Sequence, residues 1–311
     1  MELPRVYIVI LNWNGLGDTI ECVESVEKLR YPNVQIVVVD NGSSSGEADV
    51  LADKFANIDV LPQPENLGFC GGCNVGIRRS LESGAHFVIL LNNDTLVTPE
   101  LVDRLLDGFD KLPSAGAVSP LILTADDRSV WFADARWDAA GAQFQLSRAD
   151  DNYEDLKVRE PYRSEFACGC CVMFPAEVLR SHGLLDERYF AFYDEADWCY
   201  RVRKEGLESY VVPSAMIYHK VSRSTPRLVS TYLMTRNRML WMKENLTFRQ
   251  RAKSWGYLAK EFLWHFLNAN NLASGRFYSR SHSKAVLLGY RDYFLRRFGK
   301  WRKSSENLLF S

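Results

Sequence analysis

The sequence lacks several features that would assign it to a simple class of protein. No apolar run approaches the roughly 18 residues that cross a bilayer, so we expect no membrane-spanning helix. No cleavage-site pattern follows the apolar run near the N-terminus, which therefore predicts a strand rather than a signal peptide. The phosphate-binding sequence G-x-x-x-x-G-K-[ST] is absent, and the glycine-rich segment 68–76 does not follow the first predicted strand. Neither a P-loop nor a dinucleotide-binding Rossmann site is expected.

The chain also has little net charge, −1 over 311 residues, but that charge is unevenly distributed. Residues 1–222 hold 35 Asp and Glu against 20 Lys and Arg, whereas residues 223–311 hold 4 against 18. The 39 aromatic residues exclude a disordered chain. We therefore expect an acidic body, 1–222, and a basic, aromatic-rich helical region, 223–311. That region suits either peripheral contact with an anionic membrane or packing on the body or on a second copy in a homodimer.

The seven cysteines are an odd number, and without a signal segment they indicate a reducing cytoplasm. Cys70 and Cys73 form a C-x-x-C pair, and Cys168, Cys170 and Cys171 form a second group that could complete a zinc site. The chain lacks two matched C-x-x-C pairs, however, and the second group lies in an apolar, small-residue segment. Packing of the thiols in the core is the favoured interpretation.

The apolar pattern alternates between strand and helix periods. Short β-branched runs predict strands at 6–11, 34–39, 58–61 and 86–91. Helical patterns intervene at 18–29, 46–55, 74–83 and from 98 onward. This alternation predicts an α/β fold with a mostly parallel central sheet flanked by helices. Residues 126–162 are expected to form a polar insertion over the site, and the chain is expected to be helical from about residue 232.

Polar clusters follow three of the predicted strands, where α/β sheets bind their ligands. In the cluster that follows the predicted strand 34–39, Asp40 can accept a hydrogen bond from a base imide or a ribose hydroxyl, or it can stabilise a local turn. At the segment 92–94, Asp94 together with a substrate diphosphate could bind Mg²⁺ or Mn²⁺, or it could serve as a turn or cap residue.

Farther along the chain, Asp194, Glu195 and Asp197 form an acidic cluster directly after the aromatic run 190–193. Desolvation and repulsion between like charges raise a carboxyl pKa, as a general base needs. The alternative is a helix N-terminus rich in acids, which accounts for Asp197 better than for the other two. His219 lies farther along the chain, and a lone histidine is by itself weak evidence for a ligand.

The ordered set of clusters resembles the glycosyltransferase family 2 enzymes of GT-A fold, in particular their bacterial rhamnosyltransferase-like branch. Order and spacing agree over residues 5–222. The segments that carry the resemblance are 9–15 (VILNWNG), 39–44 (VDNGSS), 66–72 (NLGFCGG) with Asn74, 92–95 (NNDT), 169–174 (GCCVMF) and 185–198 (LDERYFAFYDEADW).

The resemblance implies roles for individual residues. Glu195 would be the catalytic base, with Asp194 as its neighbour. Asp94 and His219 would bind a divalent cation, Mg²⁺ or Mn²⁺, although Asn92 stands where the family has the first acid of its D-x-D signature. The residues implied to bind the nucleotide sugar are Asn12, Trp13, Asn14, Asp40, Asn41, Asn66, Gly68, Asn74 and Asn93.

The function implied is inverting transfer of a sugar from a nucleoside diphosphate to a saccharide or lipid-linked saccharide in surface polysaccharide synthesis. Within the branch, dTDP-rhamnose is the expected donor. A UDP-sugar-dependent transferase of the same fold and an inactive sugar-nucleotide-binding homologue remain alternatives. Nucleic acid is not expected as a partner, because the acidic clusters oppose binding to a phosphate backbone. The expected location is the cytoplasm, with peripheral contact at the inner face of the cell membrane left open.

Overall fold

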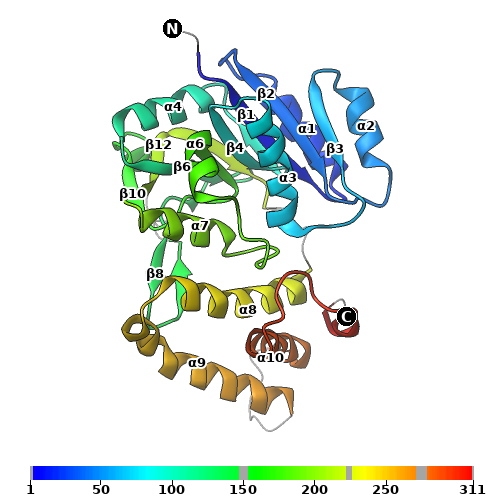
Figure 1. Ribbon diagram of the computed structural model, residues 1–311, viewed down its shortest axis with the longest axis vertical. Coiled ribbons are helices and arrows are strands. Elements are labelled where there is room, and N and C mark those ends of the chain that lie inside the picture. The colour runs from blue at the N-terminus through cyan, green and yellow to red at the C-terminus, as the bar shows by residue number, and fades with distance from the viewer. Residues whose placement is uncertain (1–2, 147–152, 222–225, 271–278, 310–311) are drawn as a thin grey trace.

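The computed structural model describes residues 3–146, 153–221, 226–270 and 279–309. A large central sheet flanked by helices forms the body, and three long C-terminal helices pack below it (Figure 1). This confirms the predicted α/β class. The boundary expected at residues 222 and 223 lies outside the described residues.

Most of the described strands belong to one large sheet. The strands of the main sheet are β1 (Val6–Asn12), β2 (Val34–Asp40), β3 (Ile58–Pro62), β4 (Phe87–Asn92), β5 (Thr95–Val97), β6 (Ala115–Thr124), β7 (Val130–Phe132), β10 (Tyr162–Ser164), β11 (Cys171–Pro175) and β12 (Glu208–His219). A separate hairpin contains β8 (Arg136–Asp138) and β9 (Gln143–Gln145). Strands β7, β8 and β9 lie within the segment 126–162, which was expected to be an irregular insertion, and β10 begins at its last residue, so the described part of that segment is more ordered than predicted.

The helices follow the same alternation through the first half of the chain. They are α1 (Leu16–Val26), α2 (Glu47–Lys54), α3 (Gly68–Glu82), α4 (Leu101–Lys111), α5 (Tyr153–Leu156), α6 (Ala176–His182), α7 (Asp194–Arg203), α8 (Arg227–Asn245), α9 (Phe248–Ala269), α10 (Arg280–Phe294) and α11 (Glu306–Leu309), with a short 3₁₀ turn at Lys303–Ser305. Among the described residues, no helix is long and apolar enough to span a membrane.

The main sheet runs in the order β10-β12-β6-β11-β4-β1-β2-β3, with β5 paired to β12 and β7 paired to β6. Strands β4, β1, β2 and β3 are parallel, as are β6 and β12, while β11 joins the two groups by antiparallel pairing. The longest pairings are thus parallel. In β1, β2 and β4 the Val, Ile and Leu runs are largely buried, as expected for parallel strands with helices on both faces of the sheet.

Register places the polar strand ends at one edge of the sheet. Asn12 is directly opposite Asp40, and Leu11 is opposite Asn92. The chain moves outward from β1 to β3 and then returns past β1 to β4, so right-handed crossovers put α3 on the face opposite α1 and α2. The polar ends predicted to form one site therefore do meet.

Helix α3 begins at Gly68, earlier than the helix predicted at 74–83. The glycines of its first half allow close approach to the sheet. A Cβ atom at Gly76 would lie 2.2 Å from Cγ1 of the buried Val9 and 3.2 Å from Val39. Packing, rather than loop flexibility, accounts for this glycine.

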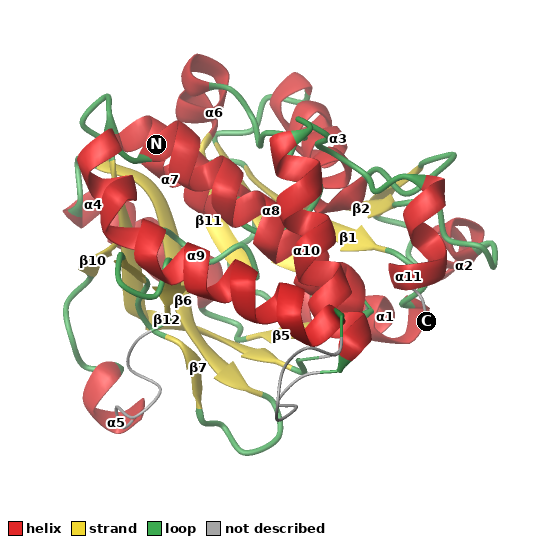
Figure 2. Cartoon of the chain, turned by 90° about the horizontal axis from the view of Figure 1, so that it is seen from below, coloured by secondary structure: helices red, strands yellow, loops and turns green. Residues whose placement is uncertain are grey.

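The C-terminal helices form a layer of their own. Helix α10 packs between α8 and α9, and α9 starts with a capping box made by Thr247 and Gln250. Seen from below, α8, α9 and α10 cross the sheet (Figure 2). Helix α8 reaches the loop before α7, where Nδ2 of Asn237 lies within hydrogen-bond distance of the carbonyl oxygens of Tyr189, Ala191 and Phe192.

We predict opposite stability changes for two glycine-to-alanine substitutions. Gly76→Ala forces a methyl group into the α3–β1 contact and should lower the free energy of unfolding by about 1–3 kcal/mol. Gly256→Ala, in α9, meets no atom within 4 Å and should raise it by about 0.5–1 kcal/mol. Urea unfolding of both variants checks this, and a stable Gly76→Ala protein would contradict the packing described here.

Candidate active site

A cleft of about 690 Å³ opens beyond the carboxyl ends of β1 and β4. Its walls come from the strand ends, from the segment before α7, from β12 and from the start of α8. Of the residues predicted to be catalytic, to bind the nucleotide sugar or to bind the metal, those that line it are Trp13, Asn14, Asn41, Asn66, Gly68, Asn93, Asp94, Asp194, Glu195 and His219. The fold therefore gathers most of the predicted site in one cavity.

Asp94 and His219 face each other across one wall. Strand β5 follows Asp94 directly and pairs with the end of β12, so that Thr95 is opposite His219. Nε2 of His219 lies 3.2 Å from Oδ1 of Asp94, and both side chains are buried. The ring of Trp131 packs edge-on against the imidazole at 4.5 Å. Pairing between two strands far apart in sequence thus creates this acid–imidazole pair.

The pair offers a donor set that a divalent cation can use. A carboxylate oxygen and an imidazole nitrogen suit Mn²⁺ or Mg²⁺ when diphosphate oxygens supply further ligands. No cluster of three or more His, Cys, Asp or Glu able to hold a metal occurs within the described ranges. Nδ1 of His219 is buried and has no hydrogen-bond partner among the described residues. Asp94 and His219 therefore fit a divalent-cation site whose remaining ligands would come from the diphosphate of the substrate.

Glu195 and Asp194 stand at the first turn of α7 on another wall of the cleft. Asp194 is almost fully buried and its Oδ2 has no hydrogen-bond partner among the described residues. Burial and the adjacent Glu195 raise the pKa of Asp194 well above its usual range. Burial also raises the pKa of Glu195, and backbone N–H groups, including that of Gly169, oppose part of this rise. A carboxylate with a raised pKa is suited to accept a proton near neutral pH.

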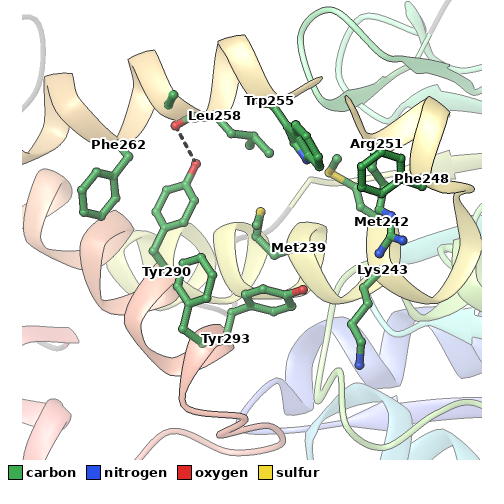
Figure 3. Close-up of a pocket in the computed structure, with 12 residues that line it drawn as sticks. Met239, Met242, Lys243, Phe248, Arg251, Trp255, Leu258, Phe262, Tyr290 and Tyr293 are labelled. Carbon is green, nitrogen blue, oxygen red and sulfur yellow. Dashed lines mark hydrogen bonds between the residues drawn. The ribbon is translucent and has the colours of Figure 1, made fainter. Parts of the chain in front are cut away.

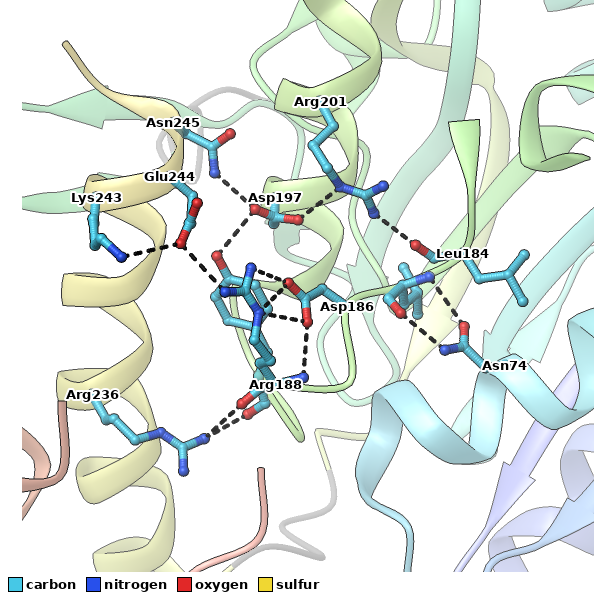
Figure 4. Close-up of polar contacts among 12 residues, drawn as sticks. Asn74, Leu184, Asp186, Arg188, Asp197, Arg201, Arg236, Lys243, Glu244 and Asn245 are labelled. Carbon is cyan, nitrogen blue, oxygen red and sulfur yellow. Dashed lines mark hydrogen bonds and ion pairs between the residues drawn. The ribbon is translucent and has the colours of Figure 1, made fainter. Parts of the chain in front are cut away.

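Asp197, on the same turn, has structural contacts. Its carboxylate accepts hydrogen bonds from the Tyr189 hydroxyl, from Nε of Arg201 and from Nδ2 of Asn245. Figure 4 shows this network between α7 and the end of α8. Asp197 thus ties the acidic helix to the C-terminal region.

Asp40 and Asn12 lie just beneath the cleft and do not line it. Nδ2 of Asn12 donates to Asp40 at 2.8 Å and to Glu47 at 2.8 Å, while its Oδ1 accepts from Thr19. The Ser43 hydroxyl also donates to Asp40, at 2.5 Å. These contacts are those of the turn interpretation, so a role for Asp40 in reading a base stays a prediction.

Several of the predicted nucleotide-binding residues hold the loops around the cleft. The side chain of Asn14 accepts from Ser44, which joins the loops after β1 and β2. Asn41 donates to Asn66 and to the carbonyl of Gly68, and so fixes the loop before α3. Their amide groups shape the rim of the cleft.

Asn74 and Asn93 differ in where they point. Asn74, in α3, lies outside the cleft and exchanges hydrogen bonds with the backbone of Leu185 (Figure 4). Asn93 lines the cleft while donating to Thr19 at 2.9 Å. Trp13 lines the cleft from the loop after β1.

Sequence reasoning named neither Trp131 nor any residue of the C-terminal region as part of the site. Trp131 comes from β7, in the segment expected to cover the site, and Phe190 and Phe192, which also line the cleft, belong to the aromatic run singled out beside Asp194. The C-terminal region adds Arg227 and Trp301. The structure adds these two, because none of the site residues predicted from the sequence lies in that region. Its basic, aromatic composition was the available signal, but composition does not indicate which face meets the body.

Comparisons with known proteins agree with this architecture. The chain is 23% identical over 251 residues to the dTDP-rhamnosyl transferase RfbF of Shigella flexneri, covering 78% of this chain and 81% of that protein. It is 26% identical over 227 residues to an N-acetylglucosaminyl-diphospho-decaprenol L-rhamnosyltransferase of Mycobacterium tuberculosis, covering 67% and 74%.

Solved structures share the GT-A fold. The mannosyltransferase PcManGT of Pyrobaculum calidifontis, solved with GDP-Man and Mn²⁺, superposes with a TM-score of 0.60 at 14% identity, over 96% of this chain and 89% of that one. The S. aureus TarS 1–349 structure gives 0.57 at 12% identity, over 93% and 80%. A family model described as Glycosyl transferase family 2 matches residues 7–183, more than half of the chain. The chain therefore belongs to glycosyl transferase family 2.

Proposed function

We propose that this glycosyltransferase transfers rhamnose from dTDP-rhamnose, with inversion, to a saccharide or lipid-linked saccharide in surface polysaccharide synthesis. One observation carries the proposal: Glu195, Asp94 and His219 line the same 690 Å³ cleft at the carboxyl edge of the sheet. The donor is supported by the relatives, both of which are rhamnosyltransferases by name.

The nucleoside diphosphate would lie along the strand ends. Trp13 offers an aromatic face for the base, and the loop tied by Asn41 and Asn66 would cover the nucleotide. Arg227 is the one arginine or lysine among the described residues that line the cleft, and it is suited to attract the anionic donor.

Glu195 would act as the base. Its carboxylate accepts the proton of an acceptor hydroxyl as that oxygen forms a bond to the anomeric carbon. The bond from the anomeric carbon to the diphosphate oxygen breaks at the same time, and the nucleoside diphosphate leaves on the opposite face. Direct displacement inverts the anomeric configuration. Asp194, buried beside the base, favours its neutral form and so avoids a second charge there.

Asp94 and His219 would hold a Mg²⁺ or Mn²⁺ ion. Such an ion neutralises the charge that develops on the leaving diphosphate. Structural neighbours were solved with Mn²⁺ and a nucleotide or nucleotide sugar, which supports this choice. The Trp131 ring packs against His219 and limits the freedom of the imidazole.

A lipid-linked acceptor would bring the enzyme to the membrane surface, and the C-terminal helices suit that task. An apolar groove of about 770 Å³ lies between α8, α9 and α10, with aromatic walls and with Lys243 and Arg251 at one end (Figure 3). Phe248 and Phe294 at this groove are 63% and 69% exposed. Exposed aromatic side chains beside cations are typical of binding to anionic membrane interfaces. We propose an anionic lipid surface as the partner of this groove.

Replacement of Glu195 by glutamine is expected to abolish catalysis while leaving the donor site intact. The amide cannot accept the proton, so kcat should fall by about 10²–10⁴-fold with little change in the donor KM. In the wild type, activity requires the deprotonated carboxylate, whose pKa burial raises, so kcat should increase with pH through a midpoint above the ordinary 4.5. Measurement of kcat and KM against pH checks both points, and this acidic limb should be absent in the variant.

Glu205→Gln is the matched control, because it makes the same change at an exposed site just beyond α7. It should leave both constants and the pH profile unchanged. Transfer at wild-type rate by Glu195→Gln would refute the assignment of the base.

The donor and the metal can be tested together with a panel of dTDP-, UDP- and GDP-sugars. We expect turnover with dTDP-rhamnose, loss of activity in EDTA, and recovery when Mn²⁺ or Mg²⁺ is returned. Turnover with a UDP-sugar instead would favour the alternative transferase, and binding without turnover of any donor would indicate an inactive homologue. Activity that EDTA does not change would refute the metal role of Asp94 and His219.

Sedimentation with phosphatidylglycerol vesicles tests the membrane surface. Phe248→Ser with Phe294→Ser removes two exposed apolar anchors and should weaken binding at least ~10-fold. Val50→Ser with Val158→Ser, also exposed but on the body, is the control and should bind like the wild type. A wild-type protein that forms dimers through the groove and ignores the vesicles would contradict the proposal.

A further inference from the structure

The loop that leads into Glu195 has an unfavourable backbone conformation. Phe190, Phe192 and Tyr193 have φ angles of 67°, 70° and 70°, in the left-handed region that side chains with a Cβ rarely occupy. Tyr193 is the residue immediately before the first turn of α7, which carries Glu195. Such a conformation persists only where surrounding contacts hold it.

Asn237 of α8 supplies those contacts. Its Nδ2 lies 2.9 Å from the carbonyl oxygen of Tyr189, 2.7 Å from that of Ala191 and 3.0 Å from that of Phe192. Its Oδ1 accepts from Nε of Arg236 at 3.0 Å, which fixes the orientation of the amide. The side chain of Asn237 is fully buried, so water cannot replace these bonds without opening the packing.

Arg236, the neighbour of Asn237 in α8, also holds the start of this loop. Its fully buried guanidinium donates to the carbonyl oxygens of Tyr189 and Arg188 and, on its other branch, to that of Gly299. Figure 4 shows Arg236 directed from α8 toward the backbone at Arg188. A buried cation is retained where carbonyl dipoles satisfy its donors.

The catalytic body holds the opposite side of the loop. The carbonyl oxygen of Phe190 accepts from the backbone N–H of Cys70 at 3.1 Å. Any Cβ at Gly68 would lie 2.4 Å from that oxygen, so the approach requires glycine. The loop is therefore held between α3 on one side and α8 on the other.

We propose that Asn237 is a positioning residue for the transfer reaction: its side-chain amide holds the strained segment 189–193 so that Glu195 is directed into the cleft. The proposal rests on the role of Glu195 as base. It gives the C-terminal region a part in catalysis that does not depend on membrane contact.

Hydrogen exchange tests, without any substrate, whether Asn237 holds the segment 189–193. Asn237→Asp keeps the size of the side chain but removes both N–H donors. Exchange measured by mass spectrometry should become faster in the peptide that covers 189–196, and alkylation of the buried Cys70 should increase. Thr235→Val, which removes only a hydroxyl bond to the carbonyl of Thr231 in α8, should change neither. Equal exchange in the two variants would overturn the proposal.

Kinetics then tests the link to Glu195. With dTDP-rhamnose as donor, Asn237→Asp should lower kcat by roughly 10²-fold with little change in donor KM, as expected for a misdirected base. In the Glu195→Gln background the same substitution should cause almost no further loss, because the group it positions is absent. Fully multiplicative losses would indicate a general structural role and overturn the proposal.

The two proposals fail in different ways. If Glu195→Gln transfers sugar normally, the base assignment is wrong whatever Asn237 does. If Glu195→Gln is inactive but Asn237→Asp behaves like Thr235→Val in exchange and in kcat, the positioning role alone is wrong. Should Asn237→Asp not fold, Asn237→Ser retains one donor and is expected to give intermediate exchange and kcat.

Discussion

The parallel register of β4, β1 and β2 is the constraint on which the rest of the structure depends. Strands β1 and β4 are buried over nearly their whole length and β2 is buried from Val37 to Asp40, so these apolar runs leave little room for a shift. A slip of one residue would separate Asn12 from Asp40 and misalign Asn92. With the register set, each change from apolar to polar residues falls at the same edge, and the cleft opens there.

The strand ends at this edge form only part of the cleft wall. Asp94 gains His219 as a neighbour because β5 pairs with β12, and the same end of β12 pairs with β6, which carries β7 and Trp131. The acid–imidazole pair is thus a consequence of sheet topology. Strand β5 has only three residues, yet it is sufficient to bring Asp94 and His219 together, because β4 before it and β12 beside it are each held by other strands of the sheet.

The acidic and basic parts of the chain meet through specific contacts rather than through net charge. The carboxylate of Asp197 accepts a hydrogen bond from Asn245, and the carbonyl oxygen of Tyr189 accepts from both Asn237 and Arg236. Neutral amide and carbonyl groups form part of this interface, together with the buried guanidinium of Arg236 and the ion pair of Arg188 with Glu244. The C-terminal helices consequently have two faces with different chemistry. One contacts the loop that leads into α7, and the other exposes the apolar groove between α8, α9 and α10.

The sequence by itself determined the α/β class, the alternation of early strands and helices, and the polar strand ends, because these follow from local periodicity and from burial of both sheet faces. It also indicated Glu195 and Asp194 through their acidic, aromatic surroundings. Only the tertiary structure decided that Asp40 lies beneath the cleft, that Asn74 supports a loop, and that Arg227 and Trp301 line the site. The physical reason is that local propensity acts over a few residues, whereas the pairing of β5 with β12 and the contact of α8 with 189–193 depend on side chains brought together by the whole fold.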